Sequence, residues 1–257
     1  MNGFDFSTIQ NVFIGGAQAS SVYLGTTKIW PISQHDYSQD YLTFEALEPG
    51  TFTWYNNNET HNVFYSTDNG TTWTEIAAGV PTETINTDQK IILKANWQYH
   101  YPGYFIATGR FNVMGNIMSL VYGDLFINNN TLATIECFFR LFYNCSTLVD
   151  ASNLILPATT LTRNCYAYMF EGCSSLTTAP ELPATTLAYQ CYVFMFAQCS
   201  SLNYIKCLAT DISATECTNY WLYNVASSGT FVKDASMTSW SSGDSGIPSG
   251  WTIQDAS

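Results

Sequence analysis

The cysteines are the residues of this chain with the widest range of possible chemistry, because thiols act as nucleophiles, cross-links and metal ligands. All eight lie between Cys137 and Cys217. Three pairs have a separation of eight residues: Cys137 with Cys145, Cys165 with Cys173, and Cys191 with Cys199. The first members of these pairs, followed by Cys217, are 28, 26 and 26 residues apart. This spacing indicates a structural repeat.

Cross-linking and metal binding are both disfavoured by the same spacing. Two residues eight apart on a helix are separated by about 12 Å, which exceeds the ~7 Å limit for the Cα atoms of a disulfide. The pattern C-x7-C is not a zinc-ligand spacing, and no histidine accompanies it. A free cysteine packs as a small hydrophobic residue. We therefore expect stacked core positions without a metal or cofactor, and unpaired thiols suit a reducing cytoplasm.

The repeat is visible when the segments CFFRLFYNCSTL, CYAYMFEGCSSL, CYVFMFAQCSSL and CTNYWLYNVASS are aligned. A period between 20 and 50 residues is typical of solenoids. Apolar residues at i, i+1, i+4, i+5 and i+8 from Cys165 predict a helix of about two turns. Residues 174–179 then suggest a strand, and Pro180 and Pro183 an extended return. The predicted repeat core consists of Cys137, Cys145, Cys165, Phe170, Cys173, Leu176, Cys191, Phe196, Cys199, Leu202 and Cys217.

These motifs carry a resemblance to a known family. The pattern F-x-x-C-S-S-L of residues 170–176 and 196–202, with the P-A-T-T-L return, resembles the BspA-like leucine-rich repeats of gut Bacteroides and their phages. The period here is longer than the usual unit of that family. The resemblance covers 109–226 and implies a leucine-rich-repeat solenoid in a virion fibre or another surface structural protein.

Residues 41–108 alternate as strands do and predict an antiparallel β-sandwich. One hairpin in it matches the Asp-box pattern S-x-D-x-G-x-T-W, formed by Ser66, Asp68, Gly70, Thr72 and Trp73. Asp-boxes recur in sialidase-like propellers, whose sites need an arginine cluster. This part of the chain has a single box and no arginine before residue 110. We therefore predict a structural hairpin and no enzyme.

The ends of the chain complete the predicted organisation. Residues 1–32 contain two or three short strands. Such a short segment cannot bury enough surface to fold alone, so it is interpreted as a β anchoring module. Residues 33–40 form a linker, and 227–257 a cap on the last repeat. Within that cap 243–248 imitates the nucleophile segment of chymotrypsin-like proteases, but lacks its second glycine and any matching histidine motif. The predicted fold class is mixed α and β: anchor, antiparallel β-sandwich, short leucine-rich-repeat solenoid and C-terminal cap.

The charge balance bears on partners. The net charge is −12, which repels phosphate backbones and anionic membranes. The apolar stretches are shorter than the ~18 residues a membrane helix requires, and the first residues lack the pattern of a signal peptide. We expect no nucleic-acid partner, no membrane insertion and synthesis in a host cytoplasm.

Together these features favour a phage virion structural protein, a capsid or tail-fibre component. It would contact other virion proteins through residues 1–32, form a homotrimer and present the repeats to a host glycan or protein. The predicted ligand contacts are Tyr168, Thr177 and Tyr189. A bacterial cell-surface or secreted adhesin remains an alternative. A glycan-active enzyme would need paired carboxylates that converge in a cleft.

Overall fold

The computed structural model describes residues 36–56, 62–97 and 100–256, and the backbones of four short strands before residue 36. The chain divides into two compact units, Met1–Asp36 and Tyr37–Ser257. In the first unit β1 pairs antiparallel with β2, and β3 with β4. These strands are β1 (Phe13–Ile14), β2 (Ala17–Gln18), β3 (Val22–Leu24) and β4 (Thr27–Trp30).

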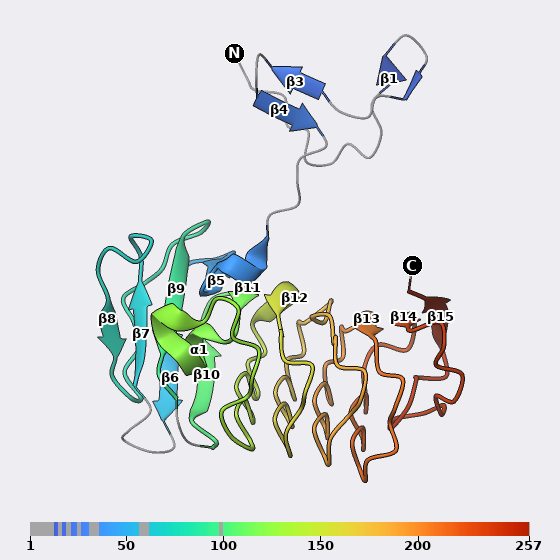
Figure 1. The fold of residues 1–257 in the computed structure, drawn as a ribbon. Coiled ribbons are helices and arrows are strands. Elements are labelled where there is room, and N and C mark those ends of the chain that lie inside the picture. Colours follow the sequence, from blue (N-terminus) through green and yellow to red (C-terminus); the bar gives the residue numbers. More distant parts are fainter. Residues whose placement is uncertain are drawn as a thin grey trace. The chain divides into compact units, whose positions relative to one another are not determined.

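The second unit begins with two sheets (Figure 1). The larger has the strand order β12-β11-β5-β9-β7-β8, and the smaller pairs β10 with β6. The strands are β5 (Leu42–Ala46), β6 (Phe52–Asn56), β7 (Val63–Ser66), β8 (Thr74–Ile76), β9 (Lys90–Ala95), β10 (Gly103–Ala107), β11 (Phe111–Asn116) and β12 (Leu148–Ile155). All pairs are antiparallel except β11 with β12. Alternating burial along β9 and β10 follows from the two-residue period of a strand.

Aromatic side chains join these sheets to the repeats. The ring of Phe44 on β5 lies 5.0 Å from that of Phe52 on β6 and 5.1 Å from that of Phe105 on β10. It also contacts Phe142, which belongs to the first repeat, at 5.9 Å. Burying one such ring contributes about 1.5–3 kcal/mol. The hydrophobic core therefore continues from the sheets into the repeats.

The predicted helix in each repeat is wrong. Residues 165–173 form consecutive turns, because Asn164, Tyr168 and Gly172 have φ values of 54°, 59° and 77°. The apolar positions i, i+1, i+4, i+5 and i+8 have a period of four residues, and a helix of 3.6 residues per turn would rotate this stripe by about 40° every four residues. A left-handed residue at every fourth position instead returns the chain to the same face. We call 137–145, 165–173, 191–199 and 217–225 the turn segments.

Backbone hydrogen bonds explain why this conformation is stable. Within a segment, alternate N–H groups donate to the carbonyl three residues earlier, as Ala167 does to Asn164 (3.2 Å). The intervening N–H groups donate to the next segment, as Tyr168 does to Val193 (2.9 Å). Four such bonds link each of the first three segments to its successor, and a fifth is donated by the residue just before each segment. The backbone groups thus satisfy one another without an α-helix.

The predicted mixed α and β fold with a leucine-rich-repeat solenoid is also wrong. The described residues contain one α-helix, α1 (Ser119–Tyr122), and two 3-10 helices, η1 (Tyr37–Gln39) and η2 (Gly123–Leu125). The sheets do not run through the repeats: β12 belongs to the six-stranded sheet and β13 to the C-terminal one. Only isolated bridges, such as Asp150 with Thr178 and Thr178 with Tyr204, lie between them. The protein is mostly β-sheet and turns.

The C-terminal residues cover the last turn segment. The parallel sheet β13-β14-β15 comprises β13 (Tyr204–Cys207), β14 (Gly229–Lys233) and β15 (Trp251–Asp255). Between the last two strands, Asp244 accepts the N–H of Leu222 through its carbonyl (3.0 Å), and Ser245 Oγ accepts that of Tyr220 (2.8 Å). Ser245, the residue at the nucleophile position of the protease-like motif, thus caps the repeat backbone.

Candidate functional site

One row of side chains crosses the four turn segments; three of them are partly buried, and the fourth, Tyr220, is exposed. Arg140, Tyr168, Phe194 and Tyr220 occupy the same position in successive segments, and we call them the exposed column. The guanidinium carbon of Arg140 lies 5.1 Å from the ring centroid of Tyr168. The rings of Tyr168 and Phe194 are 5.2 Å apart, and those of Phe194 and Tyr220 are 5.3 Å apart. The interplanar angles of these two ring pairs are 6° and 20°. The column is therefore a nearly parallel stack.

The backbone of the exposed column is unusual for large side chains. Its four residues have φ values between 51° and 60°. The left-handed conformation costs roughly 1–2 kcal/mol for residues with a Cβ, and glycine or asparagine is the ordinary occupant. The neighbouring left-handed positions hold polar residues or glycine: Glu136, Asn164, Gln190, Glu216, Asn144, Gly172, Gln198 and Asn224. Ring stacking, about 0.5–1.5 kcal/mol per pair, offsets much of the cost in the column.

The stacking decides which parts of the rings face the solvent. Each ring covers the face of its neighbour, so the outer surface of the stack consists of ring edges and tyrosine hydroxyls. Tyr220 at the C-terminal end is 45% exposed, and Tyr223 packs edge-on against it. Ring edges carry partial positive charge. The exposed column therefore offers hydrogen-bond donors and polarised C–H groups.

Arg140 stands out because three rings surround its guanidinium. Its central carbon lies 5.2 Å from the ring centroid of Phe139, 4.8 Å from that of Tyr143 and 5.1 Å from that of Tyr168. Its Nε atom is buried without a hydrogen-bond partner. Glu171 is close enough for Arg140 to favour its charged form, but burial outweighs this and raises the pKa of Glu171. A cation thus sits at the N-terminal end of the exposed column.

The three predicted ligand contacts do not lie together in the structure. Tyr168 belongs to the exposed column. Tyr189 is 40% exposed and pairs with the guanidinium of Arg163 (5.3 Å), outside the column. Thr177 is partly buried and donates from Oγ1 to the carbonyl of Val149 (3.1 Å). Sequence reasoning missed Arg140, Phe194 and Tyr220, although the aligned repeats place all three at the position of Tyr168.

All eight cysteines are buried and unpaired. Cys173 donates from Sγ to the carbonyl of Phe142 (3.1 Å), and Cys199 to that of Phe170 (3.0 Å). Burial raises the pKa of Cys137 to about 12 and that of Cys145 to about 11. A thiol held protonated is a poor nucleophile and a poor metal ligand. The other predicted core residues, Phe170, Leu176, Phe196 and Leu202, are also fully buried.

The Asp-box forms the hairpin between β7 and β8. Ser66 donates from Oγ to Asp68 Oδ1 (2.7 Å) and accepts the N–H of Gly70 (2.9 Å). Asp68 also accepts the N–H and the hydroxyl of Thr72. These bonds lower the pKa of Asp68 to about 2, the bond from the Thr72 N–H contributing most. Gly70 supplies the positive φ of 84°. The Asp-box side chains therefore accept the backbone N–H groups of their own turn.

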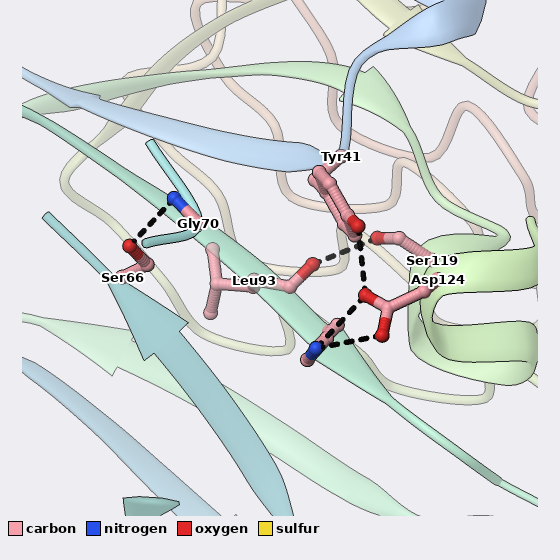
Figure 2. A network of polar contacts seen from close by, with 7 residues as sticks. Tyr41, Ser66, Gly70, Leu93, Ser119 and Asp124 are labelled. Carbon is pink, nitrogen blue, oxygen red and sulfur yellow. Dashed lines mark hydrogen bonds and ion pairs between the residues drawn. The ribbon is translucent and has the colours of Figure 1, made fainter. Parts of the chain in front are cut away.

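Figure 2 shows a polar network around Tyr41 and Asp124. The ring of Trp73, from the Asp-box, packs edge-on against that of Tyr41 at 5.3 Å. Lys94 Nζ on β9 is 4.1 Å from the Trp73 ring centroid and forms an ion pair with Asp124 Oδ1 at 2.8 Å. Tyr41 donates its hydroxyl to the same carboxylate at 2.7 Å. Burial, followed by Asp124, raises the pKa of Tyr41 to about 12. In Figure 2, Ser119 donates its hydroxyl to the carbonyl of Leu93 (2.8 Å). The network ties α1 and η2 to the large sheet.

Other kinds of site find less support. The residues that the structure describes contain no group of three or more His, Cys, Asp and Glu side chains that could hold a metal ion. Within the same residues, no helix combines the length and the apolar character needed to cross a membrane. No family model, curated protein or solved structure matches the chain. The exposed column is therefore the candidate site with the most specific geometry.

Proposed function

We propose that the chain is a structural protein of a phage virion, in the capsid or a tail fibre, and that its turn segments present the exposed column to the host surface. The observation that carries the attachment role is the stack of Tyr168, Phe194 and Tyr220 in the left-handed conformation. Strained backbone conformations cluster at binding sites, and aromatic side chains are enriched among the residues that dominate interfaces.

The stacked segments suit such a role physically. Each segment contributes one side chain to the exposed column, and the inter-segment hydrogen bonds fix the spacing between side chains. A rigid row of aromatic residues presents contact area with little loss of side-chain entropy. A host-surface glycan, which offers many hydroxyl groups to ring edges and tyrosine hydroxyls, fits this surface. The virion setting is proposed from the resemblance of the repeats to proteins of Bacteroides phages.

Two measurements test the proposal. Mass spectrometry and antibody labelling of purified particles should find the protein on the virion; detection only on uninfected bacterial cells would instead favour the adhesin. In parallel, the fluorescently labelled full chain should bind host cells. Phe194→Ala should weaken this binding at least tenfold, and Val80→Ala, which alters an exposed apolar residue outside the repeats, should leave it unchanged.

A further inference from the structure

Arg140 differs from the other members of the exposed column in having an unused binding capacity. Guanidinium groups have five N–H donors, and among the described residues that of Arg140 makes neither a hydrogen bond nor an ion pair. The three surrounding rings remove water from parts of its surface and fix its orientation. Buried polar atoms almost always have a partner. Nε itself is enclosed, so an external partner would bond to the terminal NH2 groups of this partly buried side chain.

The geometry of the group indicates the chemistry of this partner. A planar guanidinium pairs with carboxylates through two parallel hydrogen bonds, and partial desolvation strengthens them. Polyanions such as nucleic acids are unsuitable because the chain has a net charge of −12. A ligand with isolated carboxylates meets much less repulsion. The ring of Tyr143 lies 4.8 Å from the central guanidinium carbon, and Glu171 interacts electrostatically with the same group.

We propose that Arg140 binds the carboxylate of an acidic saccharide, of the uronic or sialic acid type, whose neighbouring sugars lie along the edges of Tyr168 and Phe194. This inference rests on the attachment role proposed above and specifies its ligand class. Arg163 lacks the same arrangement, because it is exposed and contacts a single ring, that of Tyr189. Arg140 is thus the anchor, and the exposed column sets the direction of the bound chain.

Calorimetric titration of the full chain tests this with two matched pairs of probes: digalacturonic acid against its dimethyl ester, and 3′-sialyllactose against lactose. We expect at least one acid to bind at least tenfold more tightly than its neutral counterpart. Arg140→Gln should abolish this preference, and Arg140→Lys should retain part of it because a lysine keeps the charge but not the planar fork. Arg110→Gln removes one positive charge at another exposed arginine and should change nothing.

Several outcomes would overturn the inference: equal affinity for acid and neutral probe, no binding of either acid at millimolar concentration, or an unchanged acid preference in Arg140→Gln. Circular dichroism and thermal unfolding of each variant separate loss of binding from loss of fold. If labelled protein still binds host cells while neither acid competes, the acidic ligand is refuted and the attachment role stands. If the chain is absent from particles and does not bind cells, the attachment role itself fails.

Discussion

The ring of Tyr168 lies parallel to that of Phe194 at 5.2 Å, although both residues have a backbone conformation that large side chains rarely adopt. Two opposing contributions to stability act at Phe194. Ring stacking with its two neighbours is favourable, and the left-handed backbone conformation is unfavourable.

Substitution of Phe194 separates the two terms. Phe194→Ala loses both ring contacts and keeps the strain, whereas Phe194→Gly loses the contacts and relieves the strain. We expect the glycine variant to be more stable than the alanine variant by about 1 kcal/mol in urea denaturation. The same pair of substitutions at Phe196, which is buried and has no positive φ, should give the opposite order. Equal stabilities at Phe194 would show that the strain is negligible.

The buried thiols predict alkaline destabilisation. Burial raises the pKa of Cys137 from its usual 9.0 to about 12, so the unfolded chain loses its thiol protons at lower pH than the folded one. This contribution to stability is complete below pH 9 and is lost as the pH rises toward 12. The free energy of unfolding should therefore fall as the pH rises from 9 toward 12. Cys137→Ala should reduce the slope, and an unchanged slope would contradict this account.

Thiol reactivity gives an independent check on the same residues. At pH 8 a chromogenic disulfide reagent should react slowly with the native protein and rapidly with all eight cysteines after denaturation. Rapid reaction of one native cysteine would identify an exposed thiolate and would contradict the described burial.

The carboxylate of Asp68 predicts a loss of stability at acid pH, whereas the thiols predict a loss at alkaline pH. The hydrogen bonds from Thr72 and Ser66 lower the pKa of Asp68 to about 2 from 3.8. The folded state therefore gains stability above pH 4, and this gain is lost as the pH falls toward 2. Asp68→Asn should lower the melting temperature at pH 7 and have less effect at pH 2.5. Asp88→Asn, at another exposed left-handed residue, serves as the control. An effect of Asp68→Asn that is independent of pH would argue against a role for the charge.

The ion pair between Lys94 and Asp124 should contribute more than an ordinary surface pair. Lys94 is only 19% exposed, and Asp124 also accepts the hydroxyl of Tyr41. A double-mutant cycle with Lys94→Met and Asp124→Asn should give a coupling energy of about 1 kcal/mol. The pair of Lys206 and Glu181, whose lysine is 33% exposed, should give less than about 0.5 kcal/mol. Equal couplings would mean that the network of Figure 2 adds no stability.

The division of the chain predicts the effect of a truncation. Tyr37–Ser257 forms a compact unit with its own core. Removal of residues 1–36 should therefore leave its cooperative unfolding intact, while, under the proposed virion role, it should prevent trimer formation and incorporation into particles. Sedimentation measurements and particle assembly check these outcomes. A truncated chain that still forms trimers would move assembly to the second unit.

The sequence indicated the repeat and its interior residues, but not the backbone conformation. The spacing of Cys165, Met169 and Cys173 is compatible with an amphipathic helix over two turns, and only the strict period of four distinguishes the turns. Asn144, Gly172 and Asn224 are ordinary residues at left-handed positions, but Tyr168 and Phe194 are not, so residue type marks only part of the pattern. The contacts of Lys94 with Asp124 and Trp73 join distant segments. No local pattern could have predicted them.

The hydrogen bonds between turn segments all run in one direction, each segment donating to its successor. The stack consequently has two unlike ends. The first segment offers carbonyls, of which that of Leu141 accepts the N–H of Phe105, and the last offers N–H groups, which Asp244 and Ser245 accept. Duplication of one internal 26-residue unit would lengthen the row of rings by one step without altering either end. A fragment cut before residue 241 would instead leave the N–H groups of Tyr220 and Leu222 without their partners and should be less stable than the full chain.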